Sequence, residues 1–322
     1  MACPTTRNVS LTVTEKGYCH IPSTGALDQD HADVRHDANN ATPRSTAGFV
    51  VRGLQEHRRA GFRPFTVLSC DNLPDNGRIT RDVVIGLVEL IDPSLATWIA
   101  DKARFPSTMF DRIVPATTRD DIATLASETG NLDQVPVFYE PFLQWVIEYN
   151  FVDDDRPAFE KIAGVQMVND VAPFEYMKIR MLNSTHSAVA YLAGHETIAD
   201  TVVNPVLNAL VGKVWASEII PTLEPPEGVD LQYYADEFLA RYANPAIRHR
   251  TWQIAMDGCQ KLPQRILDTI ADNVADGQSC DGLFLAVAAL GPSVAPVTRN
   301  GVLVAYERLA AKGTEMSASY IT

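Results

Sequence analysis

The stretch Phe65-Thr-Val-Leu-Ser-Cys-Asp-Asn-Leu-Pro-Asp-Asn-Gly77 decides the first part of the fold. Its opening, Phe65 to Cys70, is a short apolar run of the kind that parallel sheets bury between layers of helices. The continuation, Asp71 to Gly77, is dense in turn-forming residues and predicts a loop at the carboxyl end of the strand. In open α/β sheets, ligands bind at this edge. The stretch therefore predicts a buried strand that leads into a binding loop.

The flanking segments repeat this alternation of strand and helix. The predicted elements are, in order, a strand at 9–14, a helix capped at 42–45 that ends near 60, a helix at about 80–103 interrupted by Pro93, and a strand with its loop at 105–115. Strands that alternate with helices in this way predict a doubly wound α/β sheet up to about residue 130.

Two polar features of this part have competing interpretations. The carboxylates and histidines between Asp28 and Asp37 suggest a metal site, but their spacing matches no ligand template and favours a solvated loop. The adjacent Asp111 and Arg112 are interpreted either as a surface ion pair of little energetic worth or as part of a site.

Beyond residue 135 the pattern changes. Segments 135–140 and 163–168 are compatible with strands, and from Pro173 onward the chain is predicted to be almost wholly helical, with breaks at 221–228 and 244–245. We place a domain boundary near residue 150, which gives domains at 1–150 and 151–322.

One helix of the second domain carries an unusual set of polar residues. An apolar helix is predicted from Phe174 to Ala193, and at about 100° per residue Lys178, Asn183 and His186 fall within an arc of roughly 140°. Glu175 lies in the same arc, and apolar residues share this half of the helix. An ammonium, an amide, an imidazole and a carboxylate are therefore expected on one largely buried face.

This face has a structural and a functional interpretation. Single Lys or His residues on helices are usually exposed or simply hydrogen-bonded, and spacing alone favours that interpretation. In the functional one, Lys178 is an acid/base whose pKa is lowered by burial and a nearby cation. Asn183 would donate a hydrogen bond to a carbonyl oxygen that His186 orients. Such a set suits hydride transfer at a carbonyl carbon without a metal.

A second cluster concentrates cations in segment 244–261. It contains Arg248, His249, Arg250 and Lys261. One interpretation is a basic helical surface, and the other is a pocket for an anion or a polyol.

Composition limits the partners and the compartment. The 322 residues have a net charge of −13, which argues against nucleic acid or an anionic membrane as a partner. Five scattered cysteines without a paired framework favour a reducing compartment, so we expect a cytoplasmic protein. The longest apolar run, near 283–297, is broken by glycine and proline and predicts no membrane span. The sequence does not fix the oligomeric state.

Several motifs together resemble a known family. They are 12–19, 65–77, 105–115, 165–170, 178–186 and 244–265. In this order they resemble the mannitol dehydrogenase family of long-chain, metal-independent polyol and uronate dehydrogenases, most closely the branch of fructuronate reductase (D-mannonate oxidoreductase). The resemblance implies a Rossmann-like NAD-binding part at 1–150 and a mostly helical substrate and catalytic part at 151–322.

The family motif Lys-x4-Asn-x2-His implies roles on the predicted helix. Lys178 would be the catalytic acid/base, Asn183 would bind the oxyanion, and His186 would bind a substrate oxygen. Glu175 matches a carboxylate that gates proton exit from the lysine. The resemblance also implies that Asn72 is a second oxyanion-binding asparagine.

The same resemblance assigns further binding residues. Asn72, Asp111 and Phe110 would lie beside the cofactor, Asp111 would also face the substrate, and Lys261 would line the substrate pocket. The cofactor implied is NAD, with NADP as the alternative, and no metal is implied.

The substrate implied is a small 2-keto sugar acid or ketose and its 2-hydroxy form. Mannitol-type members carry an arginine where Gln253 stands, so we favour D-fructuronate/D-mannonate over D-fructose/D-mannitol. Arg248 or Arg250 is the expected partner of a substrate carboxylate.

The sequence departs from the family pattern in three places. It begins after the glycine-rich nucleotide-binding turn and the first βαβ unit, so we expect an N-terminally truncated chain. Phe110 replaces a smaller valine beside the expected cofactor position, and the family pattern fades after about Leu290. The alternative function is therefore a catalytically inactive module that binds sugars or partners.

Overall fold

The computed structural model describes residues 3–192, 196–256 and 258–293. The chain divides into two compact units: residues 1–111 with 142–172, and residues 112–141 with 173–322. Each unit is described by itself. The boundary that we placed near residue 150 lies between two points at which the chain passes from one unit to the other.

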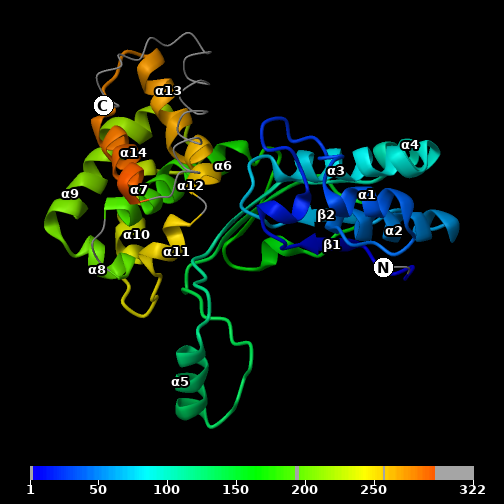
Figure 1. Cartoon of the computed structure of the whole chain (residues 1–322), viewed down its shortest axis with the longest axis horizontal. Helices are drawn as coiled ribbons and strands as arrows, with labels where there is room; N and C mark the ends of the chain where they lie inside the picture. Colours follow the sequence, from blue (N-terminus) through cyan, green and yellow to red (C-terminus); the bar gives the residue numbers. More distant parts are fainter. Residues whose placement is uncertain (1–2, 193–195, 257, 294–322) are drawn as a thin grey trace. The chain divides into compact units, whose positions relative to one another are not determined.

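The first unit is an α/β assembly (Figure 1). Its strands are β1 (Asn8–Leu11), β2 (Thr66–Ser69), β3 (Thr108–Asp111), β4 (Gln144–Glu148) and β5 (Val165–Val168). Its helices are α1 (Ala32–Asn39), α2 (Thr46–Arg59), α3 (Asn76–Ile91) and α4 (Pro93–Lys102), with 3₁₀ turns at η1 (Glu15–Tyr18), η2 (Val152–Asp154) and η3 (Phe159–Lys161). β1 and β2 pair in parallel, β4 pairs antiparallel with β3 and parallel with β5.

Helices α2 and α4 begin where their caps predict. The Ser45 hydroxyl accepts the Gly48 N–H at 3.0 Å, and the Asp92 carboxylate accepts the N–H groups of Ser94 and Leu95 ahead of α4, which has Pro93 at its start. Each cap satisfies backbone donors that a helix leaves unpaired in its first turn.

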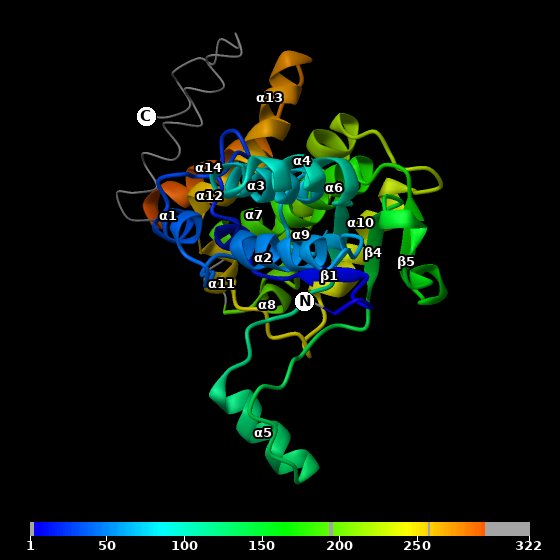
Figure 2. The same cartoon turned by 90° about the vertical axis from the view of Figure 1, so that its right-hand side faces the viewer.

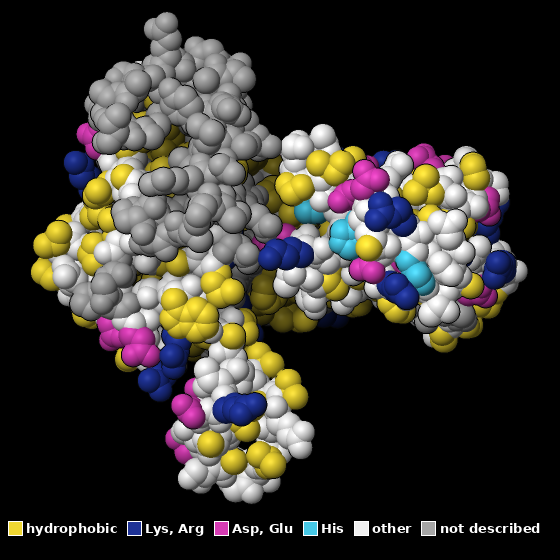
Figure 3. Space-filling model, in the orientation of Figure 1, with side chains coloured by type: hydrophobic (Ala, Val, Ile, Leu, Met, Phe, Trp, Pro, Cys, Tyr) yellow, Lys and Arg dark blue, Asp and Glu magenta, His cyan; other side chains and the backbone are white. Residues whose placement is uncertain are grey.

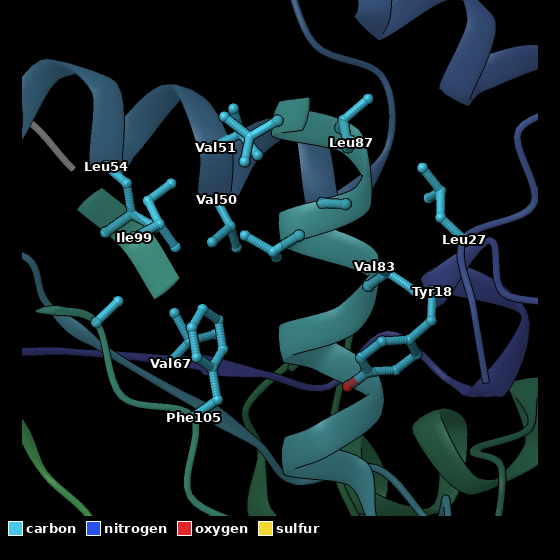
Figure 4. Packing of buried hydrophobic residues seen from close by; sticks show 14 of the residues in the cluster. Tyr18, Leu27, Val50, Val51, Leu54, Val67, Val83, Leu87, Ile99 and Phe105 are labelled. Carbon is cyan, nitrogen blue, oxygen red and sulfur yellow. The ribbon is translucent and has the colours of Figure 1, made fainter. Parts of the chain in front are cut away.

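The core of this unit lies between the β1–β2 pair and helices α2, α3 and α4 (Figures 2 and 4). Val50, Val51 and Leu54 of α2 pack with Val83 and Leu87 of α3, and all are almost completely buried. Full burial of such a side chain stabilises the fold by about 1.5–3 kcal/mol. The apolar spacing of the two helices thus fixes one face of each against the sheet.

The prediction of a solvated loop at 28–37 is wrong. Helix α1 begins after His31, whose ring accepts the Asp33 N–H, and its Val34 is buried. Asp37 is also buried because its carboxylate accepts hydrogen bonds from the backbone and hydroxyl of Ser45. Burial opposes its charge, but hydrogen bonds from His36 and Ser45 hold the pKa of Asp37 below its ordinary value.

Two further predictions needed correction. The helix expected from about Thr80 begins four residues earlier, at Asn76. The segment 135–140 forms no strand, and the strand lies instead at β4. Pro136 and Pro141 lack the N–H that a sheet ladder needs, whereas β4 offers an unbroken run of donors.

The second unit is helical throughout its described residues. Its helices are α5 (Arg119–Thr129), α6 (Ala172–Lys178), α7 (Ser184–Leu192), α8 (Ile198–Val202), α9 (Pro205–Val214), α10 (Leu231–Tyr242), α11 (Thr251–Ala255), α12 (Gly258–Leu262), α13 (Asp268–Ala275) and α14 (Asp281–Ser293). Three π-helical turns, η4 (Ile179–Asn183), η5 (Trp215–Ile219) and η7 (Pro263–Leu267), and the 3₁₀ turn η6 (Ile220–Thr222) join them. The prediction of an α/β part followed by a mostly helical part is confirmed.

The surface carries both signs of charge. Figure 3 shows acidic and basic side chains interspersed over the region of α1 to α4. Cys3, Cys19, Cys70 and Cys280 are free thiols. Within the ranges given above, no helix has the length and apolar character needed to cross a bilayer. The part of the apolar run beyond Ser293 lies outside the described residues.

Candidate active site

The helix with the four polar residues is interrupted by a π turn. Its course is α6, η4 and α7, which agrees with the predicted span as far as Leu192, while Ala193 lies outside the described residues. The Ser184 N–H donates to the Ile179 carbonyl five residues back instead of four. Single π turns of this kind are found frequently at functional sites.

The π turn changes which residues share a face. If the turn is treated as an α turn with one added residue, the arc that holds Glu175, Lys178, Asn183 and His186 narrows from roughly 140° to roughly 80°. All four side chains are buried, with exposed fractions of 5–9%. The expected buried polar face therefore exists, and it is more compact than uniform helix geometry predicts.

Side chains from other helices contact the carbonyls of this turn. The Trp215 indole N–H donates to the Met181 carbonyl at 3.0 Å, and the Tyr242 hydroxyl donates to the Leu182 carbonyl at 2.8 Å. The Thr185 hydroxyl also donates to the Met181 carbonyl, at 2.6 Å. The turn is thus bonded to η5 and to the last residue of α10.

His186 lies in an aromatic environment. Its ring stacks on Tyr242, with centroids 5.1 Å apart and planes 14° apart, and meets the edge of His249 at 4.8 Å. Its Nε2 atom is buried and has no hydrogen-bond partner within the described part of the chain. A buried polar atom without a partner is costly, which makes Nε2 a natural contact for a ligand oxygen.

Both imidazoles are held neutral near pH 7. Burial, followed by the charges of His249, Arg265, Arg241 and Lys261, places the pKa of His186 well below its ordinary value. Burial and the charge of Lys261 lower the pKa of His249 to about 4. A neutral His186 can either donate a hydrogen bond to a substrate oxygen or accept one from it.

Sequence reasoning missed His249 as a site residue. We noted it only as a member of the basic segment at 244–261, because nothing in its spacing connects it with His186. The antiparallel bridge between Thr197 and Arg250 fixes the backbone beside it.

The remaining cations of that segment differ in placement. The Lys261 ammonium donates to the carbonyls of Met256 at 2.6 Å and Ile254 at 3.5 Å. Arg248 is exposed, and Arg250 forms an ion pair with the exposed Glu196 at 3.4 Å. Lys261 therefore belongs electrostatically with the two histidines, whereas Arg248 faces solvent.

Arg265 is a buried cation beside the helix. Its guanidinium donates to the Ser187 hydroxyl at 3.1 Å, and it contributes to the lowered pKa of His186. Its position within η7 gives no sequence signal of this contact.

In the first unit, Asn72 lies in the loop after β2, as predicted. Asp71 anchors this loop, because its carboxylate accepts the N–H groups of Val13 and Thr14 and the Tyr18 hydroxyl. The loops that follow the two parallel strands β1 and β2 are therefore bonded together at the carboxyl edge. Burial raises the pKa of Tyr18, so the phenol keeps its proton.

Asn76 fixes the other end of the loop. Its amide donates to the carbonyls of Asp71 at 3.1 Å and Thr108 at 2.7 Å and accepts the Thr108 N–H at 3.0 Å. Gly77 lies so close to the next strand that an added Cβ would approach the Phe105 carbonyl oxygen to 2.4 Å. Sequence reasoning assigned the turn but not the role of Asn76 as its clamp.

Asp111 and Phe110 end strand β3. Asp111 is 2% exposed, so its interpretation as half of a surface ion pair is wrong. Arg112 instead lies over the Tyr139 ring, 4.5 Å from its centroid. Phe110 is half-buried and meets the Trp145 ring edge-on at 6.1 Å.

Comparison with known proteins decides the family. Residues 2–161 match the mannitol dehydrogenase Rossmann domain, and residues 170–317 match the mannitol dehydrogenase C-terminal domain. The chain belongs to the mannitol dehydrogenase family.

Members of the mannitol dehydrogenase family resemble the chain over most of its length. D-Mannonate oxidoreductase of Escherichia coli (strain K12) is 49% identical over 292 residues, which are 89% of this chain and 60% of that protein. Mannitol 2-dehydrogenase of Aspergillus fumigatus is 41% identical over 283 residues, 85% of this chain and 56% of that protein. The chain thus spans about 60% of the length of the curated relatives that it matches.

Solved structures in the mannitol dehydrogenase family share the fold. The Pseudomonas fluorescens mannitol 2-dehydrogenase ternary complex with NAD and D-mannitol superposes with a TM-score of 0.83 at 38% identity, over 90% of this chain and 59% of that chain. D-Sorbitol dehydrogenase in substrate-free form gives a TM-score of 0.80 at 38% identity, over 90% of this chain and 60% of that chain.

Within this mannitol dehydrogenase chain, the predicted site residues fall into two groups. Lys178, Asn183, His186 and Glu175 share one helix of the second unit, and Lys261 acts electrostatically on His186. Asn72, Phe110 and Asp111 belong to the first unit. Among the described residues, no group of three His, Cys, Asp or Glu side chains is arranged to hold a metal ion.

Proposed function

We propose that the chain is an NAD-dependent oxidoreductase that interconverts a 2-keto sugar acid, or a ketose, and its 2-hydroxy form. The observation that carries this proposal is the buried face of Lys178, Asn183 and His186, which the π turn narrows to a compact arc. A proton donor, an amide and a neutral imidazole on one face suit reduction of a carbonyl.

The carboxyl edge of β1 and β2 fits a dinucleotide. Rossmann-type folds bind it outside the carboxyl ends of parallel strands, where Asp71 holds the two following loops together. The residues proposed to lie beside it are Asn72, Asp111 and Phe110. When bound, the reduced nicotinamide supplies the hydride for the substrate carbonyl carbon.

The roles of the helix residues follow from their chemistry. Lys178 gives a proton to the oxygen of the substrate as the carbonyl is reduced, and in the oxidative direction the neutral amine removes the hydroxyl proton. The Asn183 amide donates to the developing alkoxide without adding a repelling charge. Asn72 is proposed for the same role on the basis of the family resemblance.

His186 and Glu175 complete the proposed mechanism. His186 holds a substrate oxygen through Nε2, which is buried and without a partner within the described residues. Glu175, buried one turn before Lys178, is proposed to pass the lysine proton towards solvent.

The proposed substrate pair is D-fructuronate and D-mannonate, ahead of D-fructose and D-mannitol. Support comes from the 49% identity to D-mannonate oxidoreductase, against 41% to a mannitol 2-dehydrogenase. Gln253 also stands where we expect mannitol-type members to carry an arginine. The exposed Arg248 is the proposed partner of the substrate carboxylate, and Arg250 is the alternative.

The test measures NADH binding by fluorescence and then turnover of D-fructuronate and D-fructose. We expect saturable NADH binding and a higher kcat/KM for D-fructuronate. Replacement of Arg248 by Gln should raise KM for D-fructuronate by about tenfold and leave KM for D-fructose unchanged, since only the uronate carries a carboxylate. A folded chain that binds NADH but reduces neither substrate would refute the proposal.

A further inference from the structure

The π turn η4 is an unusual local structure that the surrounding helices support. Well under 1% of residues in globular proteins adopt π-helical geometry. Such turns occur where a side chain enters the hydrogen-bond ladder of a helix. The question is which side chains hold this one.

Three successive residues of the turn are each bonded to another part of the unit. Arg180 donates to the Thr222 carbonyl and hydroxyl and forms an ion pair with Asp272 at 2.6 Å. The carbonyls of Met181 and Leu182 accept donors from elsewhere, as described above. Asn183 follows directly after these three anchored residues.

The two carbonyl contacts come from side chains with little other polar chemistry. Trp215 and Tyr242 are both 2% exposed, and each directs its polar atom at one carbonyl of the turn, at 3.0 and 2.8 Å. Backbone carbonyls inside a protein need donors, and widening a helical turn removes regular ones. The indole N–H and the phenol therefore stabilise the π form of the turn over the α form.

A second π turn of the unit is built in the same way. In η5, the Glu218 carbonyl accepts the Asn273 amide at 2.6 Å. The Glu218 carboxylate also accepts the N–H groups of Gly282 and Leu283 at the start of α14. Side-chain donors to π-turn carbonyls are thus a repeated device in this unit, and Trp215 belongs to the turn that this device holds.

We propose that Trp215 and Tyr242 are positioning residues that hold η4 in its π form and thereby place Asn183 on the face of Lys178. Reversion to a regular α-helix would rotate Asn183 away from Lys178 to about 140° around the axis. Tyr242 has a second effect, because its ring stacks on His186. One residue thus sets both the position of the amide and the plane of the imidazole. The catalytic consequence rests on the proposed function, whereas the structural consequence does not.

The test uses Trp215→Phe and Tyr242→Phe, which keep an aromatic ring and remove the donor. Tyr233→Phe is the matched control, because Tyr233 lies on the same helix as Tyr242 but is exposed, with its hydroxyl bonded to Glu237. Crystal structures of the variants show directly whether the Ser184 N–H bonds to residue 179 or to residue 180. Kinetics with NADH and D-fructuronate provide the second measurement.

We expect both variants to lose the bond from Ser184 to Ile179. We also expect kcat to fall about tenfold or more, with KM for NADH unchanged, because a displaced asparagine weakens alkoxide stabilisation and not cofactor binding. The control should retain both the turn and kcat. A change confined to packing would lower stability without this split between kcat and KM.

The two proposals fail in different ways. An unchanged π turn in both variants, with kcat within twofold of the parent, would overturn the positioning role. An inactive parent would refute the proposed function, and the crystal structures would still decide whether the two donors hold the turn. If Trp215→Phe does not fold, Tyr242→Phe alone decides, because it removes a single oxygen atom.

Discussion

The loop Asp71–Gly77 and the helix of α6, η4 and α7 both present an asparagine from irregular backbone, but they are stabilised differently. The loop is clamped by two of its own residues, Asp71 and Asn76, which bond the neighbouring strands and loops. The helix is distorted by donors that lie tens of residues later in the sequence, on η5 and α10. The first geometry is local in origin and the second is tertiary.

This difference teaches where a site is sensitive to change. A locally clamped loop depends on the few residues that form it, so substitutions there affect the fold before they affect chemistry. A turn held from outside can change its geometry while the core around it stays folded. We therefore expect mutations in the loop to show in stability and mutations at the helix to show in turnover.

The largest effect is expected from Lys178→Met. Removal of the proposed proton donor should lower kcat by about 10²–10⁴-fold, while the melting temperature stays within a few degrees because Met fills a similar volume. Lys213→Met is the control, since Lys213 is exposed near the end of α9. Near-normal turnover of D-fructuronate by the Lys178 variant would show that another group carries the proton.

The loop should respond in the opposite way. In Gly77→Ala the new methyl group meets the Phe105 carbonyl and the Ser107 N–H at 2.4 and 2.6 Å, so the strand must shift. We expect the free energy of unfolding to fall by about 2–4 kcal/mol, measured by urea denaturation. Gly212→Ala, in α9 with open space around the added atom, should be neutral or stabilising by up to about 1 kcal/mol. Equal effects of the two substitutions would contradict the proposed close approach at Gly77.

The smallest effect concerns pH and the helix side of the comparison. The pKa of His249 is about 4 in the folded chain, below its ordinary value of 6.5. The unfolded chain then binds more protons between these two values, so the free energy of unfolding should fall as pH drops from 6.5 to 4. This histidine contributes about 2–3 kcal/mol of that loss and nothing above pH 7.

The measurement is urea denaturation at pH 7 and pH 4.5 for the parent and for His249→Phe. The variant should lose less stability between the two pH values, because it cannot take up the proton. His186 titrates in the same direction, so part of the dependence should remain. An identical change in parent and variant would show that His249 is protonated in the folded chain.

The sequence predicted elements where their causes are local. The strand at Thr66–Ser69 and the caps at Ser45 and Asp92 follow from apolar runs and from short polar side chains beside helix starts. Helix α1 escaped prediction because its stability depends on Asp37, whose hydrogen bonds reach a segment eight residues later.

The candidate site shows the same limit. The polar face of Lys178, Asn183 and His186 follows from helical spacing, and its burial in the structure agrees with that prediction. The contacts of Trp215 and Tyr242 with the turn, and of His249 with His186, join residues 34–63 positions apart, and no local pattern reports them. Tertiary donors overrode the regular helix that the spacing assumed.

The π turn also bears on which changes in chain length the helix can accept. Substitutions between Lys178 and His186 alter packing, but loss of one residue there would convert the turn to α-helix and rotate all that follows by about 100°. Redesign of substrate choice in this segment should therefore vary side chains at constant length. Insertions and deletions belong instead in the breaks between helices, where no register depends on them.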